Sequence, residues 1–192
     1  MKIIAGLLRG KNFPAHSEKG VKPISGRIKQ SLFDILSPII AGARFLDLFA
    51  GTGAVGFEAL SRGGAFTFFV DQNKRCVRSI DQNIKSLGLS ARAKVFEGDV
   101  LDDLSWIPFR SGVESFNIVF LGPPYRDIKN TPLSLTSKSL ERVMEARLVS
   151  KGGLVISQRH IKEKVDVPQG LKIVKETKYG DTLLVFMRLI EP

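Results

Sequence analysis

Hydrophobic residues occur in two kinds of spacing along this chain. Short apolar runs bounded by glycine, proline or polar residues are typical of buried strands, and apolar residues three or four positions apart are typical of helices. The short runs predict strands at residues 45–49, 65–70, 93–97, 116–121, 154–157, 171–178 and 182–189. The wider spacing predicts helices at residues 27–36, 54–61, 73–87 and 133–146.

The order of these elements predicts an α/β fold. Strands that alternate with helices form a parallel sheet covered by helices on both faces. The last two strands are separated only by residues 179–181, so they predict a hairpin in which one edge strand runs antiparallel. Residues 2–8 and 11–13 predict a second, short hairpin, and residues 14–25 predict the loop that follows it.

Composition suits one domain over residues 1–192, because 43% of the residues are hydrophobic and can form a core. No apolar run approaches the roughly 18 residues of a membrane span. The N-terminal segment breaks at Gly6 and then turns basic, unlike a secretory signal. A single cysteine, Cys76, and only two histidines argue against a disulfide and a multi-cysteine metal site. We therefore expect a cytoplasmic monomer without a metal ion or a membrane partner.

The net charge points to a polyanionic partner. Lysine and arginine together number 29 against 19 acidic residues, which gives a formal charge of +10. Residues 1–40 hold seven basic and two acidic residues, a net +5 and half of the total excess. A basic N-terminal extension of this kind is typical of proteins that bind nucleic acid.

A glycine turn follows the strand at residues 45–49. Gly51, Gly53 and Gly56 fit the pattern G-x-G-x-x-G, and Asp71 lies 20 residues after the first of them. Glycines let a ligand approach the backbone closely, and an acid at the end of the next strand can accept hydrogen bonds from ribose hydroxyls. Both features suit a nicotinamide cofactor as well as a methyl donor.

Two further acids favour the methyl donor. Asp47 lies four residues before the first glycine, where it suits an ammonium group and opposes a pyrophosphate. Asp99 follows the strand at residues 93–97 and can accept from an adenine amine, although aspartate is also common at caps and turns. Three acids at three successive strand ends fit a ligand with an ammonium, a ribose and an adenine.

Residues 122–125, Gly-Pro-Pro-Tyr, follow the strand at residues 116–121, and we call them the acceptor corner. Two prolines fix the backbone and offer carbonyl oxygens without an N–H group. Such oxygens can hold the hydrogens of an exocyclic amine and turn its lone pair toward a methyl group, while Tyr125 can stack on the base. The corner therefore predicts a site for the amine of a nucleobase, with Gly122, Pro123, Pro124 and Tyr125 as its catalytic residues.

Over nearly its full length the chain resembles the bacterial methyltransferases that modify N2 of a guanosine in 16S ribosomal RNA (the RsmD family). The segments that carry the resemblance are residues 22–36, 45–63, 116–125 and 179–182. The resemblance implies a Rossmann-like class I methyltransferase fold with a seven-stranded, mostly parallel sheet and one antiparallel edge strand. It also implies S-adenosylmethionine as the donor and a small ribosomal subunit, or its assembly intermediate, as the partner.

The resemblance also assigns site residues. The cofactor-binding set that it implies is Asp47, Phe49, Ala50, Gly51, Thr52, Gly53, Asp71, Gln72, Asp99 and Val100. The residues expected to meet RNA phosphates are Arg9, Lys11, Lys22, Arg27 and Lys29.

The chain departs from the family pattern most clearly at Gly122, where the family has an aspartate. By analogy with an oxyanion-hole donor, losing one positioned group lowers the rate by about 10²–10³. Another residue can supply the acceptor, turnover can be weak or lost in a protein that still binds S-adenosylmethionine and RNA, or the source sequence can carry an Asp→Gly change. An NAD-dependent oxidoreductase and a DNA amine methyltransferase are weaker alternatives.

Overall fold

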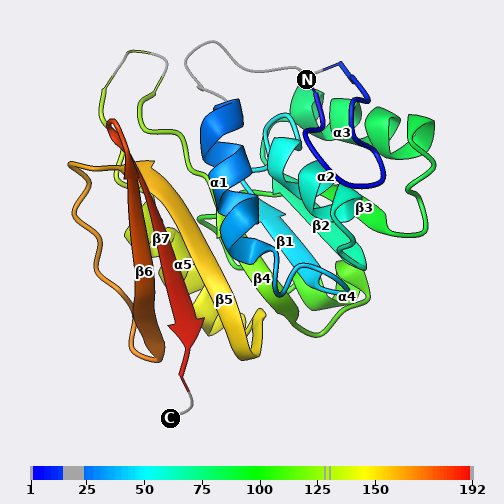
Figure 1. The fold of residues 1–192 in the computed structure, drawn as a ribbon. Helices are drawn as coiled ribbons and strands as arrows, with labels where there is room; N and C mark the ends of the chain where they lie inside the picture. The colour runs from blue at the N-terminus through cyan, green and yellow to red at the C-terminus, as the bar shows by residue number, and fades with distance from the viewer. Residues whose placement is uncertain (1, 15–23, 128, 130, 191–192) are drawn as a thin grey trace.

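The computed structural model describes residues 2–14, 24–127, 129 and 131–190. Its centre is a seven-stranded sheet with the strand order β3-β2-β1-β4-β5-β7-β6 (Figure 1). The strands are β1 (Arg44–Leu48), β2 (Phe66–Asp71), β3 (Ala93–Glu97), β4 (Phe116–Leu121), β5 (Val149–His160), β6 (Leu171–Tyr179) and β7 (Thr182–Leu189).

The direction of the strands matches the predicted fold class. Neighbouring strands from β3 to β5 pair in parallel, and β7 pairs antiparallel with both β5 and β6. The hairpin of β6 and β7 forms one side of the sheet, with β6 outermost. A sheet of this order changes its direction of winding between β1 and β4, where ligands bind in open α/β folds.

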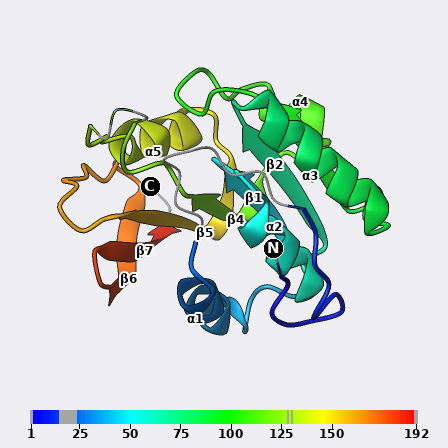
Figure 2. The same ribbon diagram turned by 90° about the horizontal axis from the view of Figure 1, so that it is seen from above.

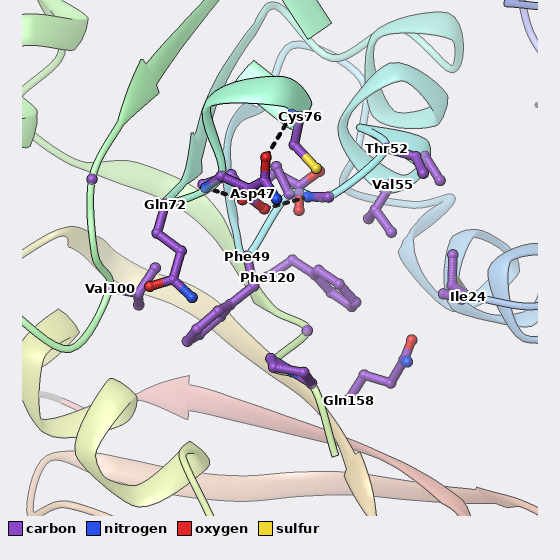
Figure 3. A pocket seen from close by; sticks show the side chains of 18 of the residues that line it. Ile24, Asp47, Phe49, Thr52, Val55, Gln72, Cys76, Val100, Phe120 and Gln158 are labelled. Carbon is purple, nitrogen blue, oxygen red and sulfur yellow. Dashed lines mark hydrogen bonds between the residues drawn. The ribbon is translucent and has the colours of Figure 1, made fainter. Parts of the chain in front are cut away.

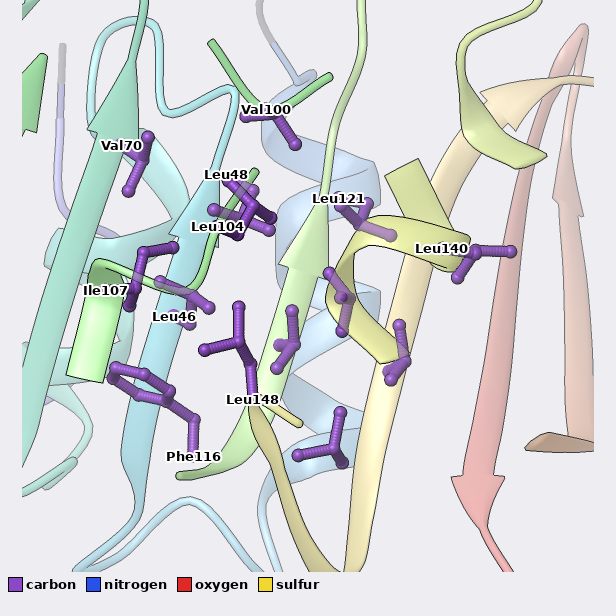
Figure 4. Packing of buried hydrophobic residues seen from close by; sticks show 14 of the residues in the cluster. Leu46, Leu48, Val70, Val100, Leu104, Ile107, Phe116, Leu121, Leu140 and Leu148 are labelled. Atoms are coloured by element: carbon purple, nitrogen blue, oxygen red, sulfur yellow. The ribbon is translucent and has the colours of Figure 1, made fainter. Parts of the chain in front are cut away.

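Helices cover both faces of the sheet, as predicted. They are α1 (Gly26–Leu36), α2 (Ala54–Ser61), α3 (Lys74–Ser86), α4 (Ile107–Ser111) and α5 (Thr136–Glu145). One apolar cluster joins α4 and α5 to the sheet (Figure 4), and two others join α1, α2 and α3 to its opposite face. Figure 2 shows α1 and α5 on opposite sides of the sheet.

Three elements differ from the predictions. Helix α4 was not predicted, because Pro108 interrupts a short apolar segment; in the structure this proline lies in the first turn, where it needs no N–H partner. Strand β5 spans Val149–His160 instead of residues 154–157, because Gly152 and Gly153 interrupt the apolar pattern without ending the strand. The predicted N-terminal hairpin is reduced to one bridge between Lys2 and Asn12.

Among residues 2–14, 24–127, 129 and 131–190, no helix is long and apolar enough to cross a membrane. The same residues contain no group of three or more His, Cys, Asp or Glu side chains that could hold a metal ion.

Candidate functional site

A cleft opens at the carboxyl ends of the central strands, and we call it the strand-end cleft (Figure 3). It contains about 920 Å³ of empty space that is partly open to solvent. The predicted site residues that line it are Asp47, Phe49, Ala50, Gly51, Thr52, Asp71, Gln72, Asp99, Val100, Gly122 and Pro124.

Backbone conformation shapes the loop between β1 and α2. Gly51 and Gly53 have φ values of 54° and 74°, in the left-handed region that favours glycine, and Phe49 has φ 60°. A Cβ atom at Gly53 would lie 2.7 Å from the Phe57 ring, and one at Gly56 would lie 2.2 Å from the Phe69 ring. Glycine is therefore needed at residue 53, because a larger side chain would collide with the Phe57 ring. Gly53 is not among the described residues that line the cleft.

Asp47 is the buried acid of the strand-end cleft. Its side chain is 2% exposed, and its Oδ2 accepts a hydrogen bond of 2.8 Å from the N–H of Gly56. Burial raises the pKa of the Asp47 carboxyl from 3.8 to about 8; the bond from Gly56 opposes this rise, and the charge of Asp71 adds to it. A cation that entered the cleft would favour the ionised form and lower this pKa again.

The other two acids also hold the loops around them. Asp71 accepts hydrogen bonds from the N–H groups of Gly51, at 2.7 Å, and Asn73, at 2.8 Å. Asp99 accepts one of 2.9 Å from the N–H of Leu101, so it is also a turn residue. Each carboxylate has more acceptor sites than these bonds use. Asp99 therefore keeps capacity for hydroxyl or amine donors of a ligand.

The acceptor corner lies at the edge of the cleft, but its four residues do not contribute equally. Gly122 and Pro124 line the cleft, whereas Pro123 and Tyr125 are not among the described residues that line it. The Tyr125 hydroxyl accepts a hydrogen bond of 3.1 Å from Gln158 and donates one of 3.4 Å to Thr182. These bonds tie Tyr125 to β5 and β7, and burial raises the pKa of its hydroxyl.

Gly122 does not have the positive φ that would require a glycine. A Cβ atom at this position would lie 3.0 Å from Cε1 of Phe120, so a small shift of that ring would admit a side chain. The backbone conformation therefore does not require glycine at residue 122.

Sequence reasoning missed several residues of the cleft. Ile24, Asn73, Cys76, Phe120 and Gln158 also line its wall (Figure 3). The sequence could have indicated Gln158, because it is a polar residue directly after the predicted strand at residues 154–157. Such a position lies at the carboxyl edge of a parallel sheet, where ligands bind. Only the structure shows that its side chain turns toward the cleft.

The residues expected to meet RNA phosphates separate into three groups. Arg9, Lys11 and Arg27 are exposed, and Lys22 lies outside the described residues. Lys29 differs from the prediction: it is 4% exposed, and its Nζ lies 2.8 Å from Oε2 of the fully buried Glu58. Moving this ammonium away to reach a phosphate would break its ion pair with the buried Glu58, which would then keep only Arg62 as a charged partner.

Comparisons with known proteins agree with this geometry. A family model described as Conserved hypothetical protein 95 matches residues 1–188. The chain is 31% identical over 185 residues to YlbH of Bacillus subtilis, which carries a provisional name as an rRNA methyltransferase; the match covers 95% of each protein. It is 29% identical over 181 residues to ribosomal RNA small subunit methyltransferase D of Haemophilus influenzae, covering 94% of this chain and 89% of that protein.

A solved structure shares the fold at low sequence identity. The RNA methyltransferase from Salinibacter ruber, in complex with S-adenosyl-L-homocysteine, superposes with a TM-score of 0.64 at 14% identity. The match covers 89% of this chain and 95% of that one.

Proposed function

Because this chain belongs to the family described as Conserved hypothetical protein 95, we propose that it is a methyltransferase that uses S-adenosylmethionine to modify ribosomal RNA. We further propose that its target is the exocyclic N2 of a guanosine in 16S rRNA, within a small subunit or its assembly intermediate. One observation carries the proposal: the three strand-end acids, the glycine loop and Gly122 with Pro124 line one cleft.

The cleft offers a partner for each polar part of S-adenosylmethionine. Asp47 suits the ammonium of the methionine end, Asp71 the ribose hydroxyls and Asp99 the adenine amine, since all three carboxylates line the cleft. The glycine loop lets the ligand approach bare backbone. When bound, the sulfonium supplies a methyl group, whose bond to sulfur breaks with its electron pair left on sulfur.

The protein's task at the acceptor is to orient a weak nucleophile. The lone pair of an exocyclic amine is delocalised into the base, and hydrogen-bond acceptors that hold the amine hydrogens turn it toward the methyl carbon. The nitrogen forms the new bond to carbon, gains the positive charge and then releases one proton to water. The base must leave its stack, or already be unpaired, to enter the cleft.

Methyl transfer to the small subunit tests the proposed function. We expect label to pass from S-adenosylmethionine to undermethylated 30S particles or 16S rRNA, and a Gly122→Asp variant to transfer it as well. No transfer to either substrate from the native chain or from the variant would refute the proposal.

A second candidate is a protein that binds S-adenosylmethionine and RNA with weak or lost turnover. Gly122 favours it, because the acceptor corner lacks a side chain at this position. This candidate predicts that the native chain binds both ligands without product and that Gly122→Asp restores transfer. The backbone conformation at residue 122 does not require glycine, although a Cβ atom there needs the Phe120 ring to move by a few tenths of an ångström.

RNA affinity should depend steeply on salt through the exposed basic residues of the N-terminal extension. A Lys11→Gln/Arg27→Gln variant is expected to flatten the plot of log affinity against log salt by about one unit for each phosphate contact removed. Filter binding of 16S rRNA across a salt series measures this slope.

The matched control removes two other exposed charges, Lys151 and Arg188, which lie near the start of β5 and the end of β7, away from the cleft. The Lys151→Gln/Arg188→Gln variant should keep the native slope. Equal slopes for the two double variants would place the RNA on another surface.

A further inference from the structure

The acceptor corner lacks a side chain at Gly122, next to a residue of the neighbouring strand that has one. Strands β4 and β5 pair in parallel, with Leu121 opposite Ser157, so the next residues along each strand, Gly122 and Gln158, are neighbours. The residues two positions earlier, Phe120 and Ile156, belong to the same apolar cluster on one face of the sheet. Because side chains alternate along a strand, Gly122 and Gln158 also share this face.

The side chain of Gln158 is held with its amide oxygen free. Its Nε2 donates a hydrogen bond of 3.1 Å to the Tyr125 hydroxyl, and that hydroxyl in turn donates a hydrogen bond to Thr182. The nitrogen of the amide therefore faces Tyr125, and the oxygen lies at the other branch of the amide. Figure 3 shows Gln158 extending toward the cavity from below, with this oxygen at its end.

This oxygen has no partner among the described residues. Gln158 is 9% exposed and lines the cleft, and its Oε1 is buried without a hydrogen bond. Buried polar atoms are nearly always paired, so Oε1 needs a donor. A ligand in the cleft that Gln158 lines can supply one.

We propose that Oε1 of Gln158 accepts a hydrogen bond from the exocyclic amine of the target base and thereby supplies the acceptor that Gly122 lacks. This inference rests on the proposed function. An amine has two hydrogens, and a Pro123 or Pro124 carbonyl can hold the second. The amide oxygen orients the lone pair and stabilises the positive charge that develops on nitrogen. It takes up no proton, because an amide remains neutral, and the released proton passes to water.

A Gln158→Leu variant removes the acceptor and keeps a side chain of similar size. With 30S particles as substrate, kcat should fall by about 10²–10³, as for the loss of one positioned polar group at a reaction centre. Affinity for S-adenosylhomocysteine should not change. Adding Gly122→Asp to this variant should recover much of the lost kcat, because the aspartate restores an acceptor from the neighbouring strand.

Two control variants isolate the role of the oxygen. Ser157→Ala removes another buried, unpaired oxygen from β5, but one that does not belong to the described cleft wall, so it should keep native activity. Tyr125→Phe removes the hydroxyl bonded to Nε2 and keeps Oε1. If Tyr125→Phe and Gln158→Leu lower kcat equally and Gly122→Asp rescues neither, Gln158 acts only by positioning Tyr125, and the proposal is wrong.

A binding measurement makes the test independent of turnover. Guanosine and inosine monophosphates differ by the N2 amine, and each can be titrated by NMR into the chain saturated with S-adenosylhomocysteine. We expect the native chain to bind the guanosine form about two- to tenfold more tightly, the usual worth of one hydrogen bond, and Gln158→Leu to lose this preference.

These outcomes distinguish the role of Gln158 from the proposed function. Normal methyl transfer with an unchanged guanosine preference in Gln158→Leu would overturn the role of Gln158 alone. Failure of the native chain to transfer methyl groups and to bind either nucleotide would overturn the proposed function, and this inference with it.

Discussion

An Asp47→Asn variant is expected to bind S-adenosylhomocysteine about 10- to 100-fold more weakly than the native chain, because it loses a charge-assisted bond to the ammonium. The same variant should be more stable at pH 8. The folded chain has an Asp47 pKa of about 8 against an ordinary value of 3.8. Between these values the unfolded chain is ionised while the folded chain keeps its proton, and each pH unit costs the folded state about 1.4 kcal/mol.

The sign of this effect is measurable. This contribution to the stability of the native chain is complete below pH 3.8 and is lost as the pH rises toward about 8. Asparagine carries no charge and keeps an oxygen for the Gly56 N–H, so thermal unfolding of the two chains should diverge between pH 5 and pH 8. A stability difference that stays constant over this range would contradict the burial of an ionisable Asp47.

Adenosine provides the matched ligand for the affinity change, because it lacks the amino-acid end. Calorimetry should show that Asp47→Asn leaves adenosine binding unchanged while S-adenosylhomocysteine binding weakens. The affinity of the native chain for S-adenosylhomocysteine should also rise from pH 6 to pH 8, since pairing requires the ionised carboxylate. Equal weakening for both ligands would remove Asp47 from the ammonium site.

Replacing Glu58 by glutamine should destabilise the chain by about 3–5 kcal/mol, the usual cost of leaving a buried charge unpaired. The fully buried Glu58 carboxylate lies 2.8 Å from Lys29 and 3.0 Å from Arg62. It also accepts the N–H groups of Ile4 and Ala5, each at 3.0 Å. Burial raises the pKa of Glu58, but these hydrogen bonds and the charge of Lys29 outweigh it and leave the pKa below its ordinary value.

Urea unfolding measures this loss, and two further variants test its origin. Asp81→Asn breaks an exposed pair with Lys85 and should cost less than about 1 kcal/mol. A Lys29→Met/Glu58→Gln double variant should be more stable than Glu58→Gln alone, because no unpaired ammonium remains. A double variant that is less stable by the sum of both single effects would mean that Lys29 and Glu58 do not act as a pair.

Most of the fold could be predicted because its strands are short, apolar and clearly bounded. The predicted bounds of β3, β4, β7 and α2 match the structure. The start of β5 was missed because residues 150–153, after Val149, are polar or glycine. Val149 pairs with Phe116 of β4, and the register then shifts before Leu154 pairs with Ile118. Helix α4 is only five residues long, too short to produce a helical periodicity.

The strand-end positions of Asp47, Asp71 and Asp99 could be predicted from the sequence, and the structure brings the three acids together in one cleft; their roles toward a ligand stay predictions. The phosphate contact predicted for Lys29 rested on its basic character alone, and in the structure Lys29 is buried and paired with Glu58. Lys29, Phe33 and Leu36 have the spacing of one helix face, and that face is buried. The part played by Gln158 depends on strand register and on an unpaired atom, neither of which a sequence displays.

The identity of the methylated nucleoside tests the central claim most directly. Undermethylated 30S particles are incubated with the native chain and labelled S-adenosylmethionine, and the 16S rRNA is digested to nucleosides for mass spectrometry. We expect the label in N2-methylguanosine. Label in a methylated adenosine or cytidine, or no labelled nucleoside from either the native chain or Gly122→Asp, would contradict the account.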